Sequence, residues 1–295
     1  MSVRFWRGTG AGVLLLLTAA AGGGPARVPV PDRELTDAER IVLERAEDVL
    51  TRQCMRRHGF RYHTAQPPTV EERRGTGYVL ADVAWAREHG YGTRIKERWL
   101  AAKQHNPNVA YYATLSPADR QRYDRALEGG PDRSRISVGL PAGGTVTSVM
   151  GGCTATANEA LYGDRATWFR AEKVATNLRP LYVPAIMRDT RFATALAAWR
   201  RCMAARGQRY ADPSEIRARL PRLTKDLSPD EAHVFEVRLA VAEATCARQT
   251  PLLATARALE DHYRAEAARP YAGELALHHR LEFEALERAR RITGS

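Results

Sequence analysis

The sequence predicts an all-α protein: a disulfide-stapled helical bundle built from two diverged helical-hairpin repeats, with a helical, aromatic insertion in the first repeat. Three observations predict this class. Apolar residues recur at helical spacing after strong helix-start signals, while the alternation typical of strands is scarce. Four cysteines follow an N-terminal segment typical of exported proteins. One short motif that contains a cysteine occurs twice along the chain.

The first 26 residues have the layout of a secretory signal peptide. Arg4 and Arg7 form a basic start, and an apolar run from Gly12 to Ala21 follows. The small residues after it offer cleavage behind Ala21 or Ala26. The apolar run is short for a membrane-spanning helix, although an uncleaved N-terminal anchor is the alternative. We therefore expect a secreted or otherwise extracytoplasmic protein.

The helix-start signals place the elements in order. Thr36 and Glu39 form a capping box that opens a helix reaching about Gly59. Ser116 and Ser228 are each followed by proline and then an acidic residue, which is a strong helix start. Further elements are expected as follows: a helix starting near Cys153, one from near Thr190 to Gly207, one opened by Asp212, a kink at Pro251 in the Ser228 helix, a final helix over about Tyr271 to Ile292, and a strand-like stretch within Ile136 to Val149.

Two landmarks recur in the same order and predict a duplication. The pattern C-M-x-x-x-G-x-R-Y begins at Cys54 and again at Cys202, each time near the end of a predicted helix. In both copies the glycine is placed to end that helix. The pattern Leu-Ser-Pro then begins at Leu115 and at Leu227, and one further cysteine follows in each half.

The predicted organisation is a signal peptide over residues 1–26, a first half over 27–170 and a second half over 171–295, packed as one body. If each half closes on itself, the disulfides join Cys54 to Cys153 and Cys202 to Cys246. Crossed pairing between the halves would also respect the symmetry. Loops of this length stabilise a fold by about 4–5 kcal/mol each in the chain-entropy model. The cysteine spacings do not suit a structural zinc site, and no cofactor or metal is expected.

Three segments carry a resemblance: the C-M-x-x-x-G motif, the stretch from Gly77 to Ala86, and the stretch from Ala240 to Cys246. Together they resemble uncharacterised exported proteins of actinomycetes. The resemblance would cover most of the mature chain, and it implies export and disulfide bonds. It supplies no catalytic residues.

The two halves differ by an insertion. Tyr62 and Leu115 are separated by 52 residues, whereas Tyr210 and Leu227 are separated by 16. Six aromatic rings lie in this insertion. Most such rings pack a core, and Trp85, in the middle of a predicted helix, is expected to do so. The functional alternative is a groove that stacks a sugar, a peptide or another ligand with a ring. Its candidate ligand-binding residues are Tyr91, Trp99, Tyr111 and Tyr112.

The net positive charge is compatible with an anionic partner and does not identify one. The formal net charge is +11, and the basic residues are 41 arginines and only 4 lysines. They are interspersed with acidic residues, as on a solvated helical face. There is no basic block or binding motif, so the sequence argues against DNA and RNA. An anionic envelope polymer or a membrane surface fits better, and the partner itself stays unknown.

No catalytic residue can be assigned from the sequence. Cys153 at a helix start could be a reactive thiol, but a structural disulfide is favoured in an exported protein. Glu274, His278 and Glu282 recur every four residues on one helix. Because no third convergent ligand is identifiable, we interpret them as a solvated ion-pair face rather than a metal site.

We therefore expect an exported, non-enzymatic binding or structural protein of the cell envelope. One alternative is an extracytoplasmic hydrolase with its site in the aromatic insertion and Asp82 or Glu88 as acid or base. Another is an accessory subunit of an export machine, which would expose a large apolar patch.

Overall fold

A computed structural model of the chain describes residues 30–74, 77–131 and 134–294. Residues from Arg33 onward form one compact unit. Most of these residues are helical, and two short strands form an antiparallel hairpin. The predicted signal peptide lies outside the described residues. Within them, no helix is both long enough and apolar enough to span a bilayer.

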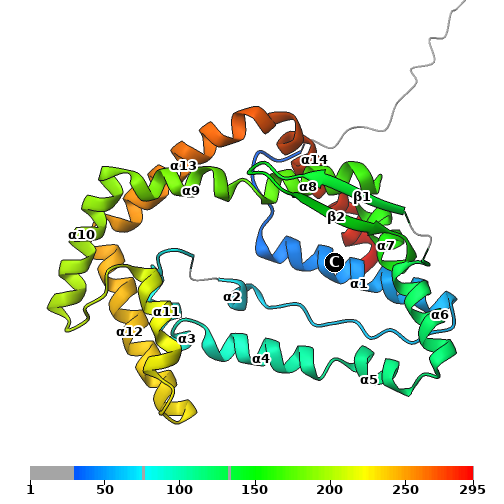
Figure 1. The fold of residues 1–295 in the computed structure, drawn as a ribbon, viewed down its shortest axis with the longest axis horizontal. Coiled ribbons are helices and arrows are strands. Elements are labelled where there is room, and N and C mark those ends of the chain that lie inside the picture. Colours follow the sequence, from blue (N-terminus) through cyan, green and yellow to red (C-terminus); the bar gives the residue numbers. More distant parts are fainter. Residues whose placement is uncertain (1–29, 75–76, 132–133, 295) are drawn as a thin grey trace, which may run out of the picture. The chain divides into compact units, whose positions relative to one another are not determined.

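Figure 1 shows the order of the elements. They are α1 (Asp37–Arg57), α2 (Val70–Arg73), α3 (Val83–His89), α4 (Thr93–Gln104), α5 (Pro107–Thr114), α6 (Pro117–Glu128), β1 (Ser134–Gly139), β2 (Thr145–Met150), α7 (Gly152–Tyr162), α8 (Arg165–Thr176), α9 (Arg179–Arg188), α10 (Thr190–Ala205), α11 (Pro213–Leu223), α12 (Pro229–Gln249), α13 (Leu252–Ala268), the 3₁₀ turn η1 (Arg269–Tyr271) and α14 (Ala272–Thr293).

The predicted caps are confirmed. The Thr36 side chain accepts the Glu39 N–H, and the Glu39 carboxylate accepts the Thr36 N–H in return. Ser228 and Glu231 form the same capping box at α12, and the Ser116 side chain caps α6 by accepting the Asp119 N–H, with proline as the first helical residue of both helices. These local signals start the helices because each one satisfies backbone N–H groups that the first turn leaves without a partner.

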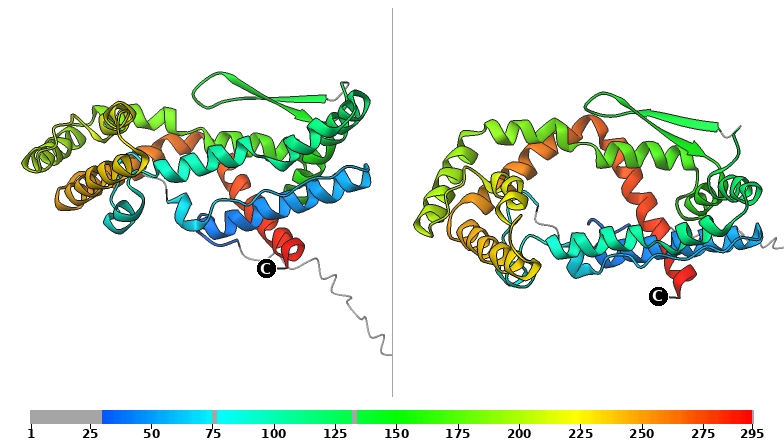
Figure 2. Two further views of the ribbon diagram at one scale, coloured as in Figure 1. Left: turned by 90° about the horizontal axis from the view of Figure 1, so that it is seen from below. Right: turned by 60° about the horizontal axis from the view of Figure 1, so that its bottom comes forward.

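The helices pack in two groups, and the packing crosses the predicted boundary at residue 170. In the first group α1 packs against α7 and α14, and α14 also packs against α8. In the second group α12 packs against α3 and α10, and α13 packs against α9 and α10. The C-terminal helix α14, drawn in red, thus lies beside α1, drawn in blue (Figures 1 and 2). Helix α3, from the first half, lies on α12 of the second.

The fold is mostly helical as predicted, and its two short strands lie at the strand-like stretch expected from the sequence. Strand β1 pairs with β2 so that Ser134 lies opposite Met150 and Gly139 opposite Thr145. The two ends of the hairpin lie close together: a side chain on Gly152 would clash with the Leu127 carbonyl oxygen. The strand-like stretch expected within Ile136 to Val149 is therefore a hairpin that leaves and rejoins the helices at one point.

The kink expected at Pro251 is a break between two helices. Helix α12 ends at Gln249, Thr250 is extended with φ −118° and ψ 165°, and α13 begins at Leu252. Proline has no N–H to continue the ladder, and it disfavours helical geometry in the residue before it. Here the chain changes direction rather than bending gently.

The two disulfides follow the pairing expected if each half closes on itself. Cys54 of α1 is bonded to Cys153 of α7, with their Cα atoms 5.5 Å apart. Cys202 of α10 is bonded to Cys246 of α12, with their Cα atoms 5.7 Å apart. Both distances lie in the ordinary range for a disulfide. A reactive Cys153 thiol is thereby overturned, because that sulfur is bonded and fully buried.

Candidate ligand-binding groove

A buried carboxylate on α12 holds the start of the aromatic insertion. Glu243 is fully buried and accepts hydrogen bonds from the Leu80 N–H (3.0 Å), the Tyr91 hydroxyl (2.8 Å) and the Arg217 guanidinium (3.1 Å). Burial raises the pKa of Glu243, against the opposing charge of Arg217. Burial also raises the pKa of the Tyr91 hydroxyl, which stays a neutral donor. The structure therefore places Tyr91, a predicted ligand residue, in an internal network.

A second buried carboxylate, seven residues earlier on α12, sets the direction of α4. Glu236 accepts the N–H groups of Tyr91 (2.6 Å) and Thr93 (3.1 Å) at the first turn of α4. A carboxylate is favourable there because a helix N-terminus carries partial positive charge. The approach requires Gly90, since a Cβ at that position would lie 2.6 Å from the Glu236 Cγ atom. Sequence reasoning missed both carboxylates.

Trp85 and Trp99 have different surroundings although both belong to the insertion. Trp85 is 4% exposed, and its indole N–H donates to the Glu71 carbonyl (3.1 Å). It packs in a cluster with Ala240 and Ala244 of α12, so its predicted core role is confirmed. Trp99, on α4, is only partly buried and lines two surface hollows.

An extended stretch over residues 61–69 runs between α1 and α4 and separates these hollows (Figure 1). The side chain of Asn108 fixes it on one side by accepting the His63 N–H (2.7 Å) and donating to the His63 carbonyl (2.8 Å). On the other side the Asp48 carboxylate of α1 accepts the Ala65 N–H (2.7 Å). Two helices thus position a segment that has no secondary structure of its own.

The hollow between this stretch and α4–α5 is a groove of about 670 Å³, which we call the Trp99 groove. Trp99 and Tyr62 contribute aromatic rings, and Arg98 and Lys103 contribute positive charge. Its acidic residue, Glu72, is paired with Arg98 at 2.7 Å. The volume lies in the range of small-ligand sites, which combine apolar surface with a few polar groups.

The hollow on the other side of the stretch is acidic and has a volume of about 340 Å³. It shares Trp99 with the groove, and Glu44, Glu47 and Asp48 of α1 line it. Burial raises the pKa of Glu47 and of Asp48. The charge of Asp48 also raises the pKa of Glu47, and the charge of Glu44 raises the pKa of both. Glu44 is paired with Arg73. Trp99 therefore stands between a cationic groove and an anionic hollow.

The remaining predicted ligand residues lie elsewhere. The ring centroids of Tyr111 and Tyr112 are 6.2 and 5.5 Å from that of Tyr123, in a cluster beside the Cys54–Cys153 disulfide. The Tyr112 hydroxyl donates to Asp124 at 2.8 Å. The structure does not bring the four predicted residues into one site, and of them Trp99 lines the groove.

The residues considered for catalysis or metal binding have other roles. Asp82 caps α3 by accepting the Trp85 N–H (3.0 Å), and the side chain of Glu88 is 74% exposed. Potential metal-ligand atoms of Cys54, His58 and Cys153 lie within 4.8 Å of one another. The two sulfurs are bonded to each other, so neither is available as a thiolate ligand.

The solvated face predicted for α14 needs correction at His278 and Glu282. Their side chains are only 14% and 17% exposed, and His278 Nδ1 lies 3.5 Å from a Glu282 oxygen. The reason is long-range packing: Trp168 of α8 stacks on the His278 ring, with centroids 5.1 Å apart and 14° between the planes. Helical periodicity on α14 alone carries no signal of a neighbour so distant in the sequence.

Comparison with known proteins identifies no relative of this chain. The sequence matches no known protein family and no curated protein, and the fold matches no solved structure, at a significant level. The chemistry of the Trp99 groove is therefore interpreted from its own residues.

Proposed function

We propose that this protein is an exported, non-enzymatic binding protein of the cell envelope that holds an anionic glycan chain in the Trp99 groove. The observation that carries the proposal is the combination of the Trp99 and Tyr62 rings with the charges of Arg98 and Lys103 in one open groove. The two disulfides support an oxidising compartment, which agrees with export.

The groove chemistry favours a glycan that carries carboxylates. An aromatic face offers a large, rigid apolar surface against which the C–H face of a sugar can pack. The flexible ammonium of Lys103 supplies a positive charge for such a carboxylate, and the planar guanidinium of Arg98, which pairs with Glu72, can offer its remaining N–H groups. The net charge of +11 also attracts polyanions before contact.

We further propose that the fold is a duplication and that the groove lies mainly in the insertion that only the first copy has, with Tyr62 of the repeated motif at its edge. The ends of α1 and α10 support this. Gly59 and Gly207 have left-handed φ values of +84° and +74°. The next N–H groups donate to Met55 and Met203 carbonyls at 3.0 and 2.9 Å. This shared cap is explained by folding, which leaves the insertion as the part available for function.

Binding of soluble polymers tests the proposal. Alginate, a uronic-acid polymer, and neutral dextran are compared for binding to the mature protein at low and moderate salt. We expect alginate to bind and dextran to bind weakly. Trp99→Ala should weaken alginate binding about fivefold or more, because a stacked ring contributes about 1 kcal/mol beyond its buried area. Lys103→Gln should also weaken alginate binding, and it should do so more at low salt than at moderate salt, because salt screens the charge of Lys103.

Leu100→Ala is the matched control, because Leu100 is the next residue on α4 and its side chain is 48% exposed. It should leave binding and melting temperature unchanged. Equal binding of dextran and alginate would exclude charge recognition. Unchanged alginate binding in the Trp99→Ala variant, with the fold intact, would place the site elsewhere.

A further inference from the structure

A second cavity, distinct from the Trp99 groove, lies between α8 and α14 beneath the segment that precedes α1. Its volume is about 490 Å³. A stack of three rings forms one side: Tyr162 lies on Trp168 with centroids 3.9 Å apart and planes 10° apart, and Trp168 lies on His278. Because Tyr162 and Trp168 are only 8% and 9% exposed, the ring stack lies at the bottom of the cavity, which we call its floor, and not on the outer surface.

Among the carboxylates that line the cavity, Glu282 differs in the kind of partner it has. Two other carboxylates of the cavity have cationic partners at short range: Glu172 pairs with Lys173 at 2.8 Å, and Glu34 pairs with Arg264 at 2.5 Å. The close partner of Glu282 is His278. Burial, aided by the charge of Arg40, holds the pKa of His278 at about 4, so this imidazole is neutral at neutral pH. The half-buried Glu282 carboxylate therefore faces the cavity beside an uncharged partner.

A positively charged side chain lies at the outer edge of the cavity, which we call its rim. Arg40 lines the cavity, its side chain is 40% exposed, and its Nε–H donates to the Leu35 carbonyl (3.3 Å). The nearest Glu34 oxygen is 3.9 Å from the Arg40 guanidinium, so that contact is a long one. The Glu282 carboxylate thus lies among the less exposed residues of the cavity, and the Arg40 guanidinium lies among the more exposed ones.

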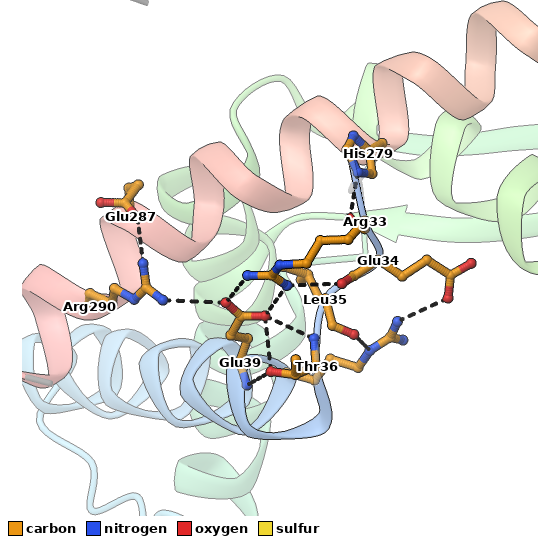
Figure 3. Close-up of polar contacts among 9 residues, drawn as sticks. Arg33, Glu34, Leu35, Thr36, Glu39, His279, Glu287 and Arg290 are labelled. Atoms are coloured by element: carbon orange, nitrogen blue, oxygen red, sulfur yellow. Dashed lines mark hydrogen bonds and ion pairs between the residues drawn. The ribbon is translucent and has the colours of Figure 1, made fainter. Parts of the chain in front are cut away.

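The rim is held in place by the network in Figure 3. Arg33 forms a two-pronged ion pair with Glu39, with distances of 2.7 and 2.8 Å, and Arg290 of α14 reaches the same carboxylate at 3.4 Å. The ring of His279 meets the Arg33 carbonyl at 2.8 Å. These contacts fasten the start of α1 onto α14, so Arg40 and Glu282 keep a fixed relation.

We propose that this cavity binds a small zwitterion with a planar ring, such as a free aromatic amino acid. Its ammonium group pairs with Glu282, its carboxylate pairs with Arg40, and its ring packs against the Tyr162–Trp168–His278 stack. A volume of about 490 Å³ suits a ligand of this size. Glu282 has a neutral imidazole as its close partner, and burial raises its pKa against the opposing charge of Arg40. An ammonium that pairs with Glu282 favours the ionised carboxylate in a site from which water is largely excluded.

Three related compounds separate the parts of this recognition. L-phenylalanine carries both charges, 2-phenylethylamine lacks the carboxylate, and 3-phenylpropanoate lacks the amine. Isothermal titration of the mature protein should give the order L-phenylalanine, then 2-phenylethylamine, then 3-phenylpropanoate. Glu282→Gln, which keeps the shape of the side chain, should weaken L-phenylalanine binding about tenfold or more, since a hydrogen bond to a charged group contributes about 1.5–3 kcal/mol.

Glu284→Gln is the control, because Glu284 is on the same helix, is 44% exposed and pairs with Arg288 outside this cavity. It should bind L-phenylalanine like the wild type. Melting curves of both variants establish that they fold. The proposal is overturned if none of the three compounds binds at millimolar concentration, if 3-phenylpropanoate binds as well as L-phenylalanine, or if folded Glu282→Gln binds unchanged. Alginate binding in the groove should be the same in both variants, so this result and that of the groove are independent.

Discussion

Helices α1 and α10 end in the same way, but the chain follows a different course after each of them. Each ends in Cys-Met followed by three residues and a left-handed glycine, and Met55 and Met203 are both fully buried. After Gly207 the chain soon enters α11 and α12. After Gly59 it runs through the extended stretch 61–69 and the insertion before α6. The comparison teaches that the shared features serve the fold, because caps, buried methionines and disulfides account for them. Most of the Trp99 groove, Trp99 included, belongs to the insertion that has no counterpart after α10, and Tyr62 at its edge is the last residue of the repeated motif.

Removing the disulfides should have the largest effect on stability, and it tests whether the two halves of the chain are equivalent. The Cys54→Ala/Cys153→Ala and Cys202→Ala/Cys246→Ala variants should each lose about 3–5 kcal/mol of unfolding free energy. The sequence separations are 99 and 44 residues. Chain entropy depends only logarithmically on loop length, so the two losses should differ by less than about 1 kcal/mol. Urea unfolding of both variants measures the difference.

Both cysteines of each pair are replaced by alanine and not by serine. Cys153 and Cys246 are fully buried, so a serine would add a polar group in the core and a destabilisation of its own. A large loss for one pair beside almost none for the other would show that the two bonds are not equivalent. Equal losses would show that the two bonds stabilise the fold to the same extent.

The sequence predicted the parts of the fold that depend on near neighbours. The caps at Thr36, Ser116 and Ser228 act over three residues, and each was placed correctly. The ends at Gly59 and Gly207 need only a left-handed residue after a helix. Trp85 was assigned to the core because it lies within a helix.

The features that sequence reasoning missed depend on distant partners. Glu236 and Glu243 lie on α12, and their N–H donors come from residues 80–93. Acidic residues are rarely buried, so the general expectation pointed the other way. The available signal was that Glu243 stands within an alanine-rich run on a predicted core helix. Likewise, His278 is covered by Trp168 of α8, which no periodicity on α14 reveals.

A smaller effect is expected at the starts of helices. Glu39 of α1 and Glu231 of α12 are both third residues of capping boxes, but Glu39 also pairs with Arg33 and Arg290. The Arg33 hydrogen bonds lower the pKa of Glu39 to about 2. A lowered pKa gives stability that is complete above the unfolded-state pKa and is lost as the pH falls from about 4.5 towards 2. Glu39→Gln should therefore cost about 1–2 kcal/mol at pH 7 and much less at pH 2.5.

Glu231→Gln is the matched control, because it removes the charge from a capping box that lacks the two arginines. Its cost should be smaller and should change less with pH. Denaturant unfolding of both variants at pH 7, 4 and 2.5 provides the curves. Parallel curves for the two variants would mean that the network in Figure 3 adds nothing beyond the cap itself.

The smallest effect tests the shared helix ends directly. A Cβ on Gly59 or on Gly207 would meet no atom within 4 Å, so neither substitution creates a clash. Gly59→Ala and Gly207→Ala should therefore cost only the strain of a left-handed alanine, about 1 kcal/mol each. Gly90→Ala has the same sign of φ, but its Cβ would come within 2.6 Å of the buried Glu236 side chain, so it should cost clearly more. Unfolding free energies of the three variants check this order. Unequal costs at Gly59 and Gly207 would mean that one helix end depends on its surroundings and that the resemblance of the two caps is local only. A cost at Gly90 no larger than at the other two would mean that the Glu236 contact can relax, and α4 would then be less firmly positioned above the groove.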